Sequence, residues 1–173
     1  MISRQCAVVI VAALLGAVLP EWCLASPITV AYTATDLGNG HWHCAYSVRN
    51  DSWVQPIEEF TIWFDQSKYR NMHIATPDPP AGDWNELVVQ PDPILHDDGF
   101  YDALATNSGI AVGDHVQGFA VEFDWLVAGS PGPQRYDIVD PVTVEKLYSD
   151  FTVPEPASLA LLAGGLALAR RRR

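Results

Sequence analysis

Cysteine is scarce in this sequence, which has three cysteines among 173 residues. Cys6 and Cys23 both lie within the first 25 residues, so Cys44 is alone in the remainder of the chain. No disulfide can therefore form within that remainder, and its core has to be held together by packing and hydrogen bonding.

Basic residues are also few, with 10 lysines and arginines against 21 aspartates and glutamates. Half of them lie at the two ends of the chain, Arg4 at the start and Arg170 to Arg173 at the finish. Residues 26–152 keep five basic and 19 acidic residues, a net charge of about −14. This imbalance excludes nucleic acid and anionic membrane surfaces as favourable partners. The partners that remain possible are cations, basic proteins and neutral glycans, and the alternative is that the charge serves solubility alone.

Sustained helical periodicity is missing between the two ends, where apolar and polar residues alternate instead. Phe119, Val121 and Phe123 share one strand face, with Glu122 and Asp124 on the other. Similar segments occur at 28–35, 41–48, 59–64, 86–90, 134–140 and 142–148. Turn-forming residues separate them, and 71–82 and 90–99 are expected to be long loops. The pattern predicts an all-β fold, an antiparallel two-sheet β-sandwich over residues 26–152.

The first 25 residues have the three-part order of a secretory signal peptide. Arg4 supplies positive charge, an apolar stretch follows from Cys6 to Leu19, and small residues precede Ser26. This order predicts cleavage by signal peptidase between Ala25 and Ser26. An uncleaved anchor helix is the alternative.

The other end of the chain holds Pro154-Glu155-Pro156, then an apolar run, then four arginines. The run from Leu159 to Ala169 has 11 residues, about 17 Å as a helix, whereas a hydrocarbon core is about 30 Å thick. The sequence therefore predicts a short C-terminal hydrophobic helix with transient membrane association. The residues that stop translocation on the cytoplasmic side would be Arg170, Arg171, Arg172 and Arg173.

Residues 153–173, with this Pro-Glu-Pro, short apolar run and arginine cluster, resemble the PEP-CTERM sorting signal of Gram-negative bacteria that make exopolysaccharide. The resemblance implies that Pro154, Glu155 and Pro156 are read by exosortase, a membrane-embedded protease that cuts near them. It also implies export across the inner membrane to the cell envelope, cell surface or extracellular matrix. The expected organisation is a signal peptide at 1–25, an ectodomain at 26–152 and a sorting signal at 153–173.

Two segments carry residue types that bind metals. His41 and His43 are close to Cys44, but alternation along a strand points the thiol to the opposite face. We therefore favour two solvated histidines and a buried thiol over a two-histidine metal site. A second segment offers the hard oxygen donors that calcium prefers, from Asp92, Asp97, Asp98 and Asp102. It lacks the spacing and the closing glutamate of an EF-hand loop, so turn formation is favoured, calcium is the alternative, and no other cofactor is expected.

Signals of catalysis are missing as well. The sequence has no GxSxG, zinc motif or phosphate loop, and the adjacent Glu58 and Glu59 would point to opposite faces of a strand. We expect no enzyme, with a small hydrolase as the third choice, and a structural or adhesive role with exopolysaccharide as a partner. The rival class is a calcium- or carbohydrate-binding module. Trp53 and Trp84, beside turns, would stack on a sugar in that class, or else cover the ends of the core.

Overall fold

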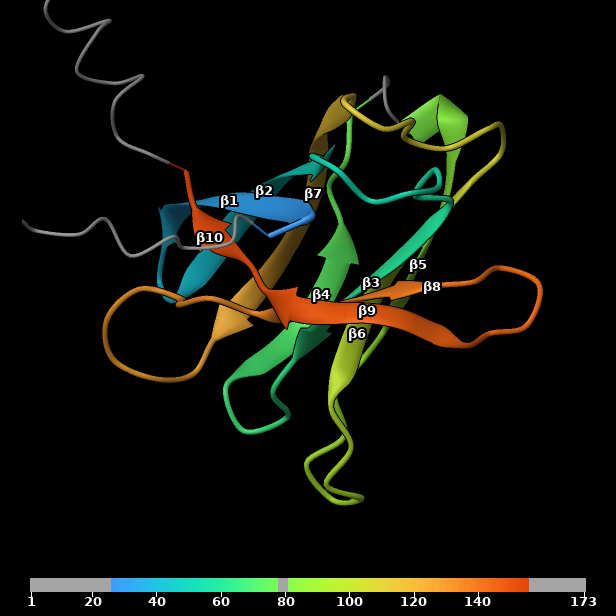
Figure 1. Cartoon of the computed structure of the whole chain (residues 1–173). Helices are drawn as coiled ribbons and strands as arrows, with labels where there is room; N and C mark the ends of the chain where they lie inside the picture. The colour runs from blue at the N-terminus through green and yellow to red at the C-terminus, as the bar shows by residue number, and fades with distance from the viewer. Residues whose placement is uncertain (1–25, 78–80, 156–173) are drawn as a thin grey trace, which may run out of the picture.

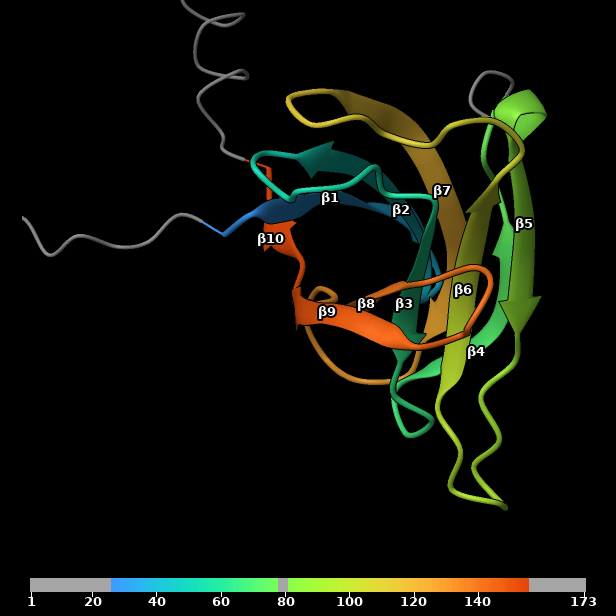
Figure 2. The same cartoon turned by 45° about the vertical axis from the view of Figure 1, so that its right-hand side comes forward.

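The computed structural model describes residues 26–77 and 81–155, which form two five-stranded sheets enclosing one core (Figures 1 and 2). The first, the β1 sheet, has the order β10 (Val153–Pro154), β1 (Ile28–Gly38), β2 (His41–Asn50), β7 (His115–Trp125) and β4 (Tyr69–Ile74). The second, the β3 sheet, has the order β5 (Trp84–Val89), β6 (Gly99–Ala105), β3 (Glu59–Phe64), β8 (Arg135–Val139) and β9 (Lys146–Phe151). The predicted all-β sandwich is confirmed.

Strand pairing is antiparallel throughout the described residues, with one exception at an edge. There β10 runs parallel to β1, with Ala31 opposite Val153 and Tyr32 opposite Pro154. The sequence prediction of an antiparallel two-sheet sandwich did not include this short parallel strand.

The alternation read from the sequence sets the faces of both sheets. On β7, Phe119, Val121 and Phe123 are buried, whereas Glu122 and Asp124 are half-exposed on the outer face. The strand β3 occupies the segment predicted for it, and its Phe60 packs edge-to-face on Phe119 across the sandwich, with ring centroids 4.9 Å apart. Aromatic rings from both sheets therefore fill the core, which holds without a disulfide.

Two tryptophans weighed as sugar-stacking residues belong to this core instead. Trp84 is buried, and its ring stands at 90° to Phe119 with centroids 5.1 Å apart. Trp53 is partly buried against the core, with its ring 5.7 Å from that of Tyr148. Both rings cover the packed interior, the second of the two roles expected for them.

One predicted loop was partly wrong, because residues 69–74, which overlap the expected loop 71–82, form the edge strand β4. Asp102, grouped with the aspartates of the neighbouring loop as a possible calcium ligand, lies within β6. The inward residues of β6 include glycine and alanine, and a bulge interrupts the alternation of β4, so neither segment shows a clear period of two in the hydropathy of its sequence.

The β1–β2 turn fixes where β2 begins. Asn39 and Gly40 both have positive φ, 55° and 80°, as a two-residue type I′ hairpin turn requires. The carbonyl of Gly40 accepts a hydrogen bond from the backbone N–H of Trp125, at 2.8 Å. The turn thereby sets His41 opposite Asp124 in the strand register.

Helical structure in residues 26–77 and 81–155 is limited to one turn of 3₁₀-helix, Ala81–Asp83. None of the helical structure described there is long and apolar enough to cross a membrane. The predicted signal peptide and the predicted C-terminal helix lie outside the described residues.

Candidate metal site and sorting segment

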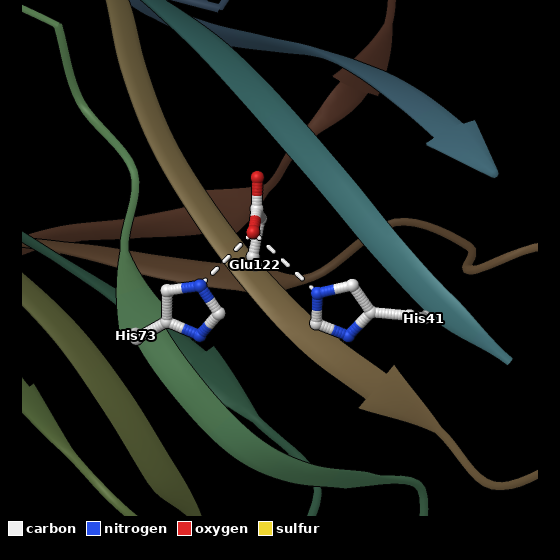
Figure 3. A group of neighbouring side chains, drawn as sticks. All are labelled: His41, His73 and Glu122. Atoms are coloured by element: carbon white, nitrogen blue, oxygen red, sulfur yellow. Dashed lines mark hydrogen bonds and ion pairs between the residues drawn. The ribbon is translucent and has the colours of Figure 1, made fainter. Parts of the chain in front are cut away.

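Glu122 lies at the centre of a polar cluster on the outer face of the β1 sheet. In the strand register it stands between His43 of β2 and His73 of β4. Its Oε1 is 3.1 Å from Nδ1 of His43, and its Oε2 is 2.9 Å from Nε2 of His73 and 3.4 Å from Nε2 of His41. Figure 3 shows the rings of His41 and His73 on either side of the carboxylate. One carboxylate thus contacts three imidazole rings.

A second carboxylate holds the other ring nitrogen of His41. Oδ1 of Asp124 is 3.0 Å from Nδ1 of His41, and its Oδ2 accepts a hydrogen bond from the Asn71 amide at 2.6 Å. An ionised carboxylate can only accept, so this contact assigns a hydrogen to Nδ1 of His41. In the neutral ring Nε2, which is directed at Glu122, is then a free lone-pair donor.

His73 reaches Glu122 because β4 contains a bulge. Arg70 pairs with Asp124 and His73 with Glu122, so two residues of β4 stand opposite one of β7 between these pairs. The first of the two, Asn71, has φ of 53°, in the left-handed region that asparagine tolerates better than most residues. The extra residue turns the side chain of His73 toward the carboxylate, as bulges commonly do.

Gln90 satisfies the backbone that the bulge leaves without a strand partner. Its Oε1 accepts a hydrogen bond from the N–H of Met72 at 2.9 Å, and its side-chain amide donates to the carbonyl of the same residue. Met72 itself is buried, so the bulge is anchored on the core side and polar on the outer side.

The charged groups of the cluster shift one another's pKa. The hydrogen bond to Asp124 is the main cause that raises the pKa of His41, and Glu122 adds to it. Hydrogen bonds from His43, then from His73 and, when its ring is protonated, from His41 lower the pKa of Glu122. The pKa of Asp124 is lowered chiefly by the Asn71 amide and then by His41. Both carboxylates are therefore more acidic than isolated ones and are ionised at neutral pH.

The sequence interpretation of the His41 segment was right about the faces. Cys44 is buried, and both histidines lie on the opposite, half-exposed face. It expected both histidines to be solvated and named no partners for them, whereas His41 stacks on His73, with ring centroids 5.9 Å apart and planes 14° apart. His73 lay in a segment predicted to be a loop, so the pair was missed. The outward-facing histidines of β2 and carboxylates of β7 were the available signal.

The four aspartates weighed for calcium, Asp92, Asp97, Asp98 and Asp102, have other partners. Asp92 accepts hydrogen bonds from backbone N–H groups two and three residues ahead, and it pairs with Asp97 through the backbone. Asp98 accepts from the N–H of Gln66, and Asp102 from the hydroxyl of Thr61. Among the described residues, the three side chains placed to share a metal ion are His41, His73 and Glu122, and none of the four aspartates belongs to that group.

A cleft of about 590 Å³ lies beside the ends of several strands from both sheets. The side chains lining it include Trp63, Asp65, Lys68, Asp98, Trp125 and Arg135. The guanidinium of Arg135 stacks over the Trp63 ring, 4.7 Å from its centroid, and Nε1 of Trp63 donates to Asp137 at 2.9 Å. Aromatic surface mixed with charges of both signs suits an uncharged polar ligand.

The described structure extends into the predicted sorting signal. Strand β10 pairs with β1, and the N–H of Glu155 donates to the carbonyl of Tyr32 at 2.9 Å. Pro154 and Glu155 are exposed. Thr152, just before them, is buried and hydrogen-bonded to Gln134. The packed sandwich therefore ends at Thr152, and the first two residues of the Pro-Glu-Pro lie along its edge.

Other predicted processing residues are mostly beyond the described part of the chain, namely Ala25, Pro156, Arg170, Arg171, Arg172 and Arg173. Ser26 is described: its hydroxyl donates to the carbonyl of Ile28 at 2.6 Å and lies 2.8 Å from the hydroxyl of Tyr148. The predicted cleavage site thus directly precedes a residue that is bonded to the sandwich. Cleavage there stays a prediction.

The fold and the segment together define a β-sandwich that leads directly into a C-terminal sorting signal. Residues 152–173 match the PEP-CTERM protein-sorting motif, which confirms the resemblance carried by Pro154-Glu155-Pro156 and the residues after it. The chain is therefore an exported, cell-surface-targeted protein whose signal is of the kind that exosortase recognises.

Two solved structures resemble the sandwich weakly. A crystal structure of an inactive mutant of GH20 exo-β-N-acetylglucosaminidase from Vibrio harveyi aligns with a TM-score of 0.39 at 14% identity, covering 76% of this chain and 18% of that one. The same enzyme in complex with N-acetylglucosamine gives 0.36 at 13% identity over the same shares. The chain thus spans less than a fifth of that protein, and no functional argument follows. No curated protein matches the chain.

Proposed function

We propose that this protein is a non-enzymatic structural or adhesive component of the envelope or extracellular matrix of a Gram-negative bacterium, associated with exopolysaccharide. The observation that carries the proposal is the sorting motif at 152–173, which starts where the buried part of the sandwich ends. No further domain lies between the two. The sandwich at 26–152 is therefore the part of the chain that the signal delivers.

The charge of the sandwich narrows the class of matrix partner. With a net charge of about −14 over residues 26–152, the surface repels anionic polymers at low and moderate salt. A neutral polysaccharide, or one that carries cationic groups, is the expected partner.

Fractionation of the native host tests this proposal. In cells with an intact exosortase, the protein should be found with the exopolysaccharide, and deletion of the polysaccharide synthase should release it into the medium. Processing of its C-terminal signal, followed by intact mass, serves as the control because it should be the same in both strains. A distribution that ignores the polysaccharide would rule out the structural role while leaving the sorting intact.

A second candidate function is carbohydrate binding in the cleft, and the two tryptophans Trp63 and Trp125 that line it favour this. Aromatic rings stack on the apolar faces of sugar rings, and the neighbouring charges can accept or donate hydrogen bonds to hydroxyls. Calcium has less support as a ligand, because Asp92, Asp98 and Asp102 are each engaged in other hydrogen bonds.

Titration calorimetry with oligosaccharides released from the matrix tests the cleft. Trp63→Ala should weaken binding by at least tenfold. Leu87→Ala is the matched control, because Leu87 is an exposed apolar residue of the same sheet that does not line the cleft. Equal affinities for the two variants would remove the cleft as the binding site.

A further inference from the structure

We propose that His41, His73 and Glu122 bind a divalent transition-metal ion, with Zn²⁺ as the best match, on the outer face of the β1 sheet (Figure 3). Two imidazoles and one carboxylate form a donor set that zinc uses often, whereas calcium and magnesium prefer oxygen ligands alone. The site is independent of the cleft and of the sorting signal, and the structural role proposed above does not require it.

The ligand atoms are already close enough to share one ion. Zinc binds nitrogen and oxygen at about 2.0 to 2.2 Å, so two ligands of a tetrahedral ion lie about 3.3 to 3.6 Å apart. Oε2 of Glu122 is 3.4 Å from Nε2 of His41 and 2.9 Å from Nε2 of His73, and one atom from each of the three residues lies within 4.8 Å of the others. Small side-chain rotations bring the three atoms to the tetrahedral separations.

Two of the three ligands, His41 and Glu122, are also held in place by hydrogen bonds with neighbouring side chains. Asp124 accepts from Nδ1 of His41, which leaves Nε2 as the metal-binding nitrogen, and Asn71 holds Asp124 in turn. His43 is hydrogen-bonded to Oε1 of Glu122, the oxygen that the ion would not use. Carboxylate–histidine–metal arrangements of this kind orient ligands and strengthen metal binding.

Three strands contribute one ligand each to the site, and one of them, β4, is the edge strand of the sheet. His73 reaches the cluster only because of the bulge beside Asn71, which is held on its core side by Gln90. Bulges often direct a side chain toward a functional site, and regular pairing of β4 with β7 would not require this one.

Exposure allows an ion to enter. The side chains of His41, His73 and Glu122 are 33%, 53% and 26% exposed, so the ligands can be reached from solvent but are not fully surrounded by it. Glu122 and Asp124 supply two negative charges, and the neighbouring Arg70 offsets one of them. Three protein ligands leave at least one coordination position for water or for a donor from another molecule.

Zinc titration of the untagged full-length protein, made metal-free with a chelator, tests the site by calorimetry. The parent protein should bind one ion per chain. His73→Ala and Glu122→Gln should each weaken binding by at least tenfold, and Asp124→Asn by about 10- to 100-fold through the orientation of His41. His115→Ala is the matched control, because His115 lies on β7 outside the cluster and should leave the affinity unchanged.

Cobalt gives a second readout, which reports the coordination geometry of the bound ion as well as its binding. Co²⁺ in the parent protein should show the strong visible absorption of four-coordinate cobalt, and Glu122→Gln should lose it. Should Glu122→Gln fail to fold, His73→Ala still decides the matter, because His73 is on an edge strand with its ring half-exposed. A parent protein that binds no zinc, or a His73→Ala variant that binds it as tightly as the parent, would overturn the proposal.

Discussion

Nε2 of His73 lies 2.9 Å from Oε2 of Glu122, although the two residues are 49 positions apart in the sequence. The contact depends on a single extra residue in β4, whose backbone takes a left-handed conformation at Asn71. The place of His73 in the cluster therefore depends on how well that one backbone conformation is tolerated.

Substitutions at Asn71 test this dependence. Asn71→Ala loses the hydrogen bond to Asp124 and adds left-handed strain, which costs about 1 to 2 kcal/mol for a residue with a Cβ. Asn71→Gly loses the same hydrogen bond but carries no such strain. The alanine variant should thus be less stable than the glycine variant by about 1 kcal/mol in urea unfolding. Equal stability of the two variants would mean that the bulge is not strained at this position.

Cys44 should be chemically inert in the folded protein. Burial raises the pKa of its thiol to about 12, so almost no thiolate exists at neutral pH. In a chain with Cys6→Ser and Cys23→Ser, a thiol reagent should react slowly at pH 8 and quickly after denaturation. Fast labelling of the folded chain would show that β2 does not hold Cys44 in the core.

Asp65, which lies outside the proposed metal site, should make the stability of the folded protein depend on pH. Its hydrogen bonds to Lys68, and then to Ser67, lower the pKa of the carboxyl from 3.8 to about 2. Because the folded pKa is the lower one, the stabilisation is fully present above pH 3.8 and is lost as the pH falls toward 2. Lys68 and Asp65 are both well exposed, so the contribution is below about 1 kcal/mol.

Denaturant unfolding of the parent and of Asp65→Asn measures this pH-dependent contribution to the free energy of unfolding. The parent should be the more stable of the two at pH 7, and the difference should shrink steadily between pH 4 and pH 2. A difference that is the same at pH 2 and at pH 7 would show that the carboxylate form of Asp65 has no special stability in the folded state.

The sheet interiors could be predicted from the sequence because their physics is local. Alternation along β7 and β2 follows from the pleat, which puts Phe123 in the core and Glu122 outside, and Cys44 in the core and His43 outside. The regular spacing of such segments then favours a sandwich. None of this requires knowledge of which strands are neighbours.

The cluster around Glu122 could not be predicted in the same way, because it depends on strand order. The sequence places His43 and Glu122 outward on their own strands, but only the sheet order β2-β7-β4 puts His73 on the far side of Glu122. The bulge in β4 also gives its buried residues, Tyr69 and Met72, a spacing of three instead of two. That spacing hid the strand, and with it the third imidazole.

The pairing of β10 with β1 limits the access of a protease to the Pro-Glu-Pro. Glu155 is bonded to Tyr32 and β10 lies along β1, so a protease that reads the Pro-Glu-Pro has to lift these residues from the sheet. The pairing is short, and each backbone hydrogen bond is worth about 1 kcal/mol, so lifting costs little. Pro154 also lacks an N–H with which to strengthen the edge.

Replacement of Pro154-Glu155-Pro156 by three alanines should therefore trap the protein before processing. Alanine at 154 restores an N–H, which favours the edge pairing, and alanine at 156 removes the restriction that keeps residue 155 extended. In a host that has exosortase, we expect export and folding as in the parent, with an unprocessed form in the membrane fraction. Intact mass measures the processing, and membrane fractionation measures where the unprocessed form lies.

Two further variants separate recognition of the Pro-Glu-Pro from general damage to the segment. Val153→Ala with Ser158→Ala changes the flanks only and should be processed like the parent. Serine at positions 170–173 should instead weaken retention, because each arginine costs about 2.5 to 3.5 kcal/mol to draw through hydrocarbon, and uncut protein should reach the outside. If the triple-alanine variant is processed and distributed like the parent, Pro154, Glu155 and Pro156 are not what exosortase reads. The flank variant then shows whether Val153 or Ser158 is read instead.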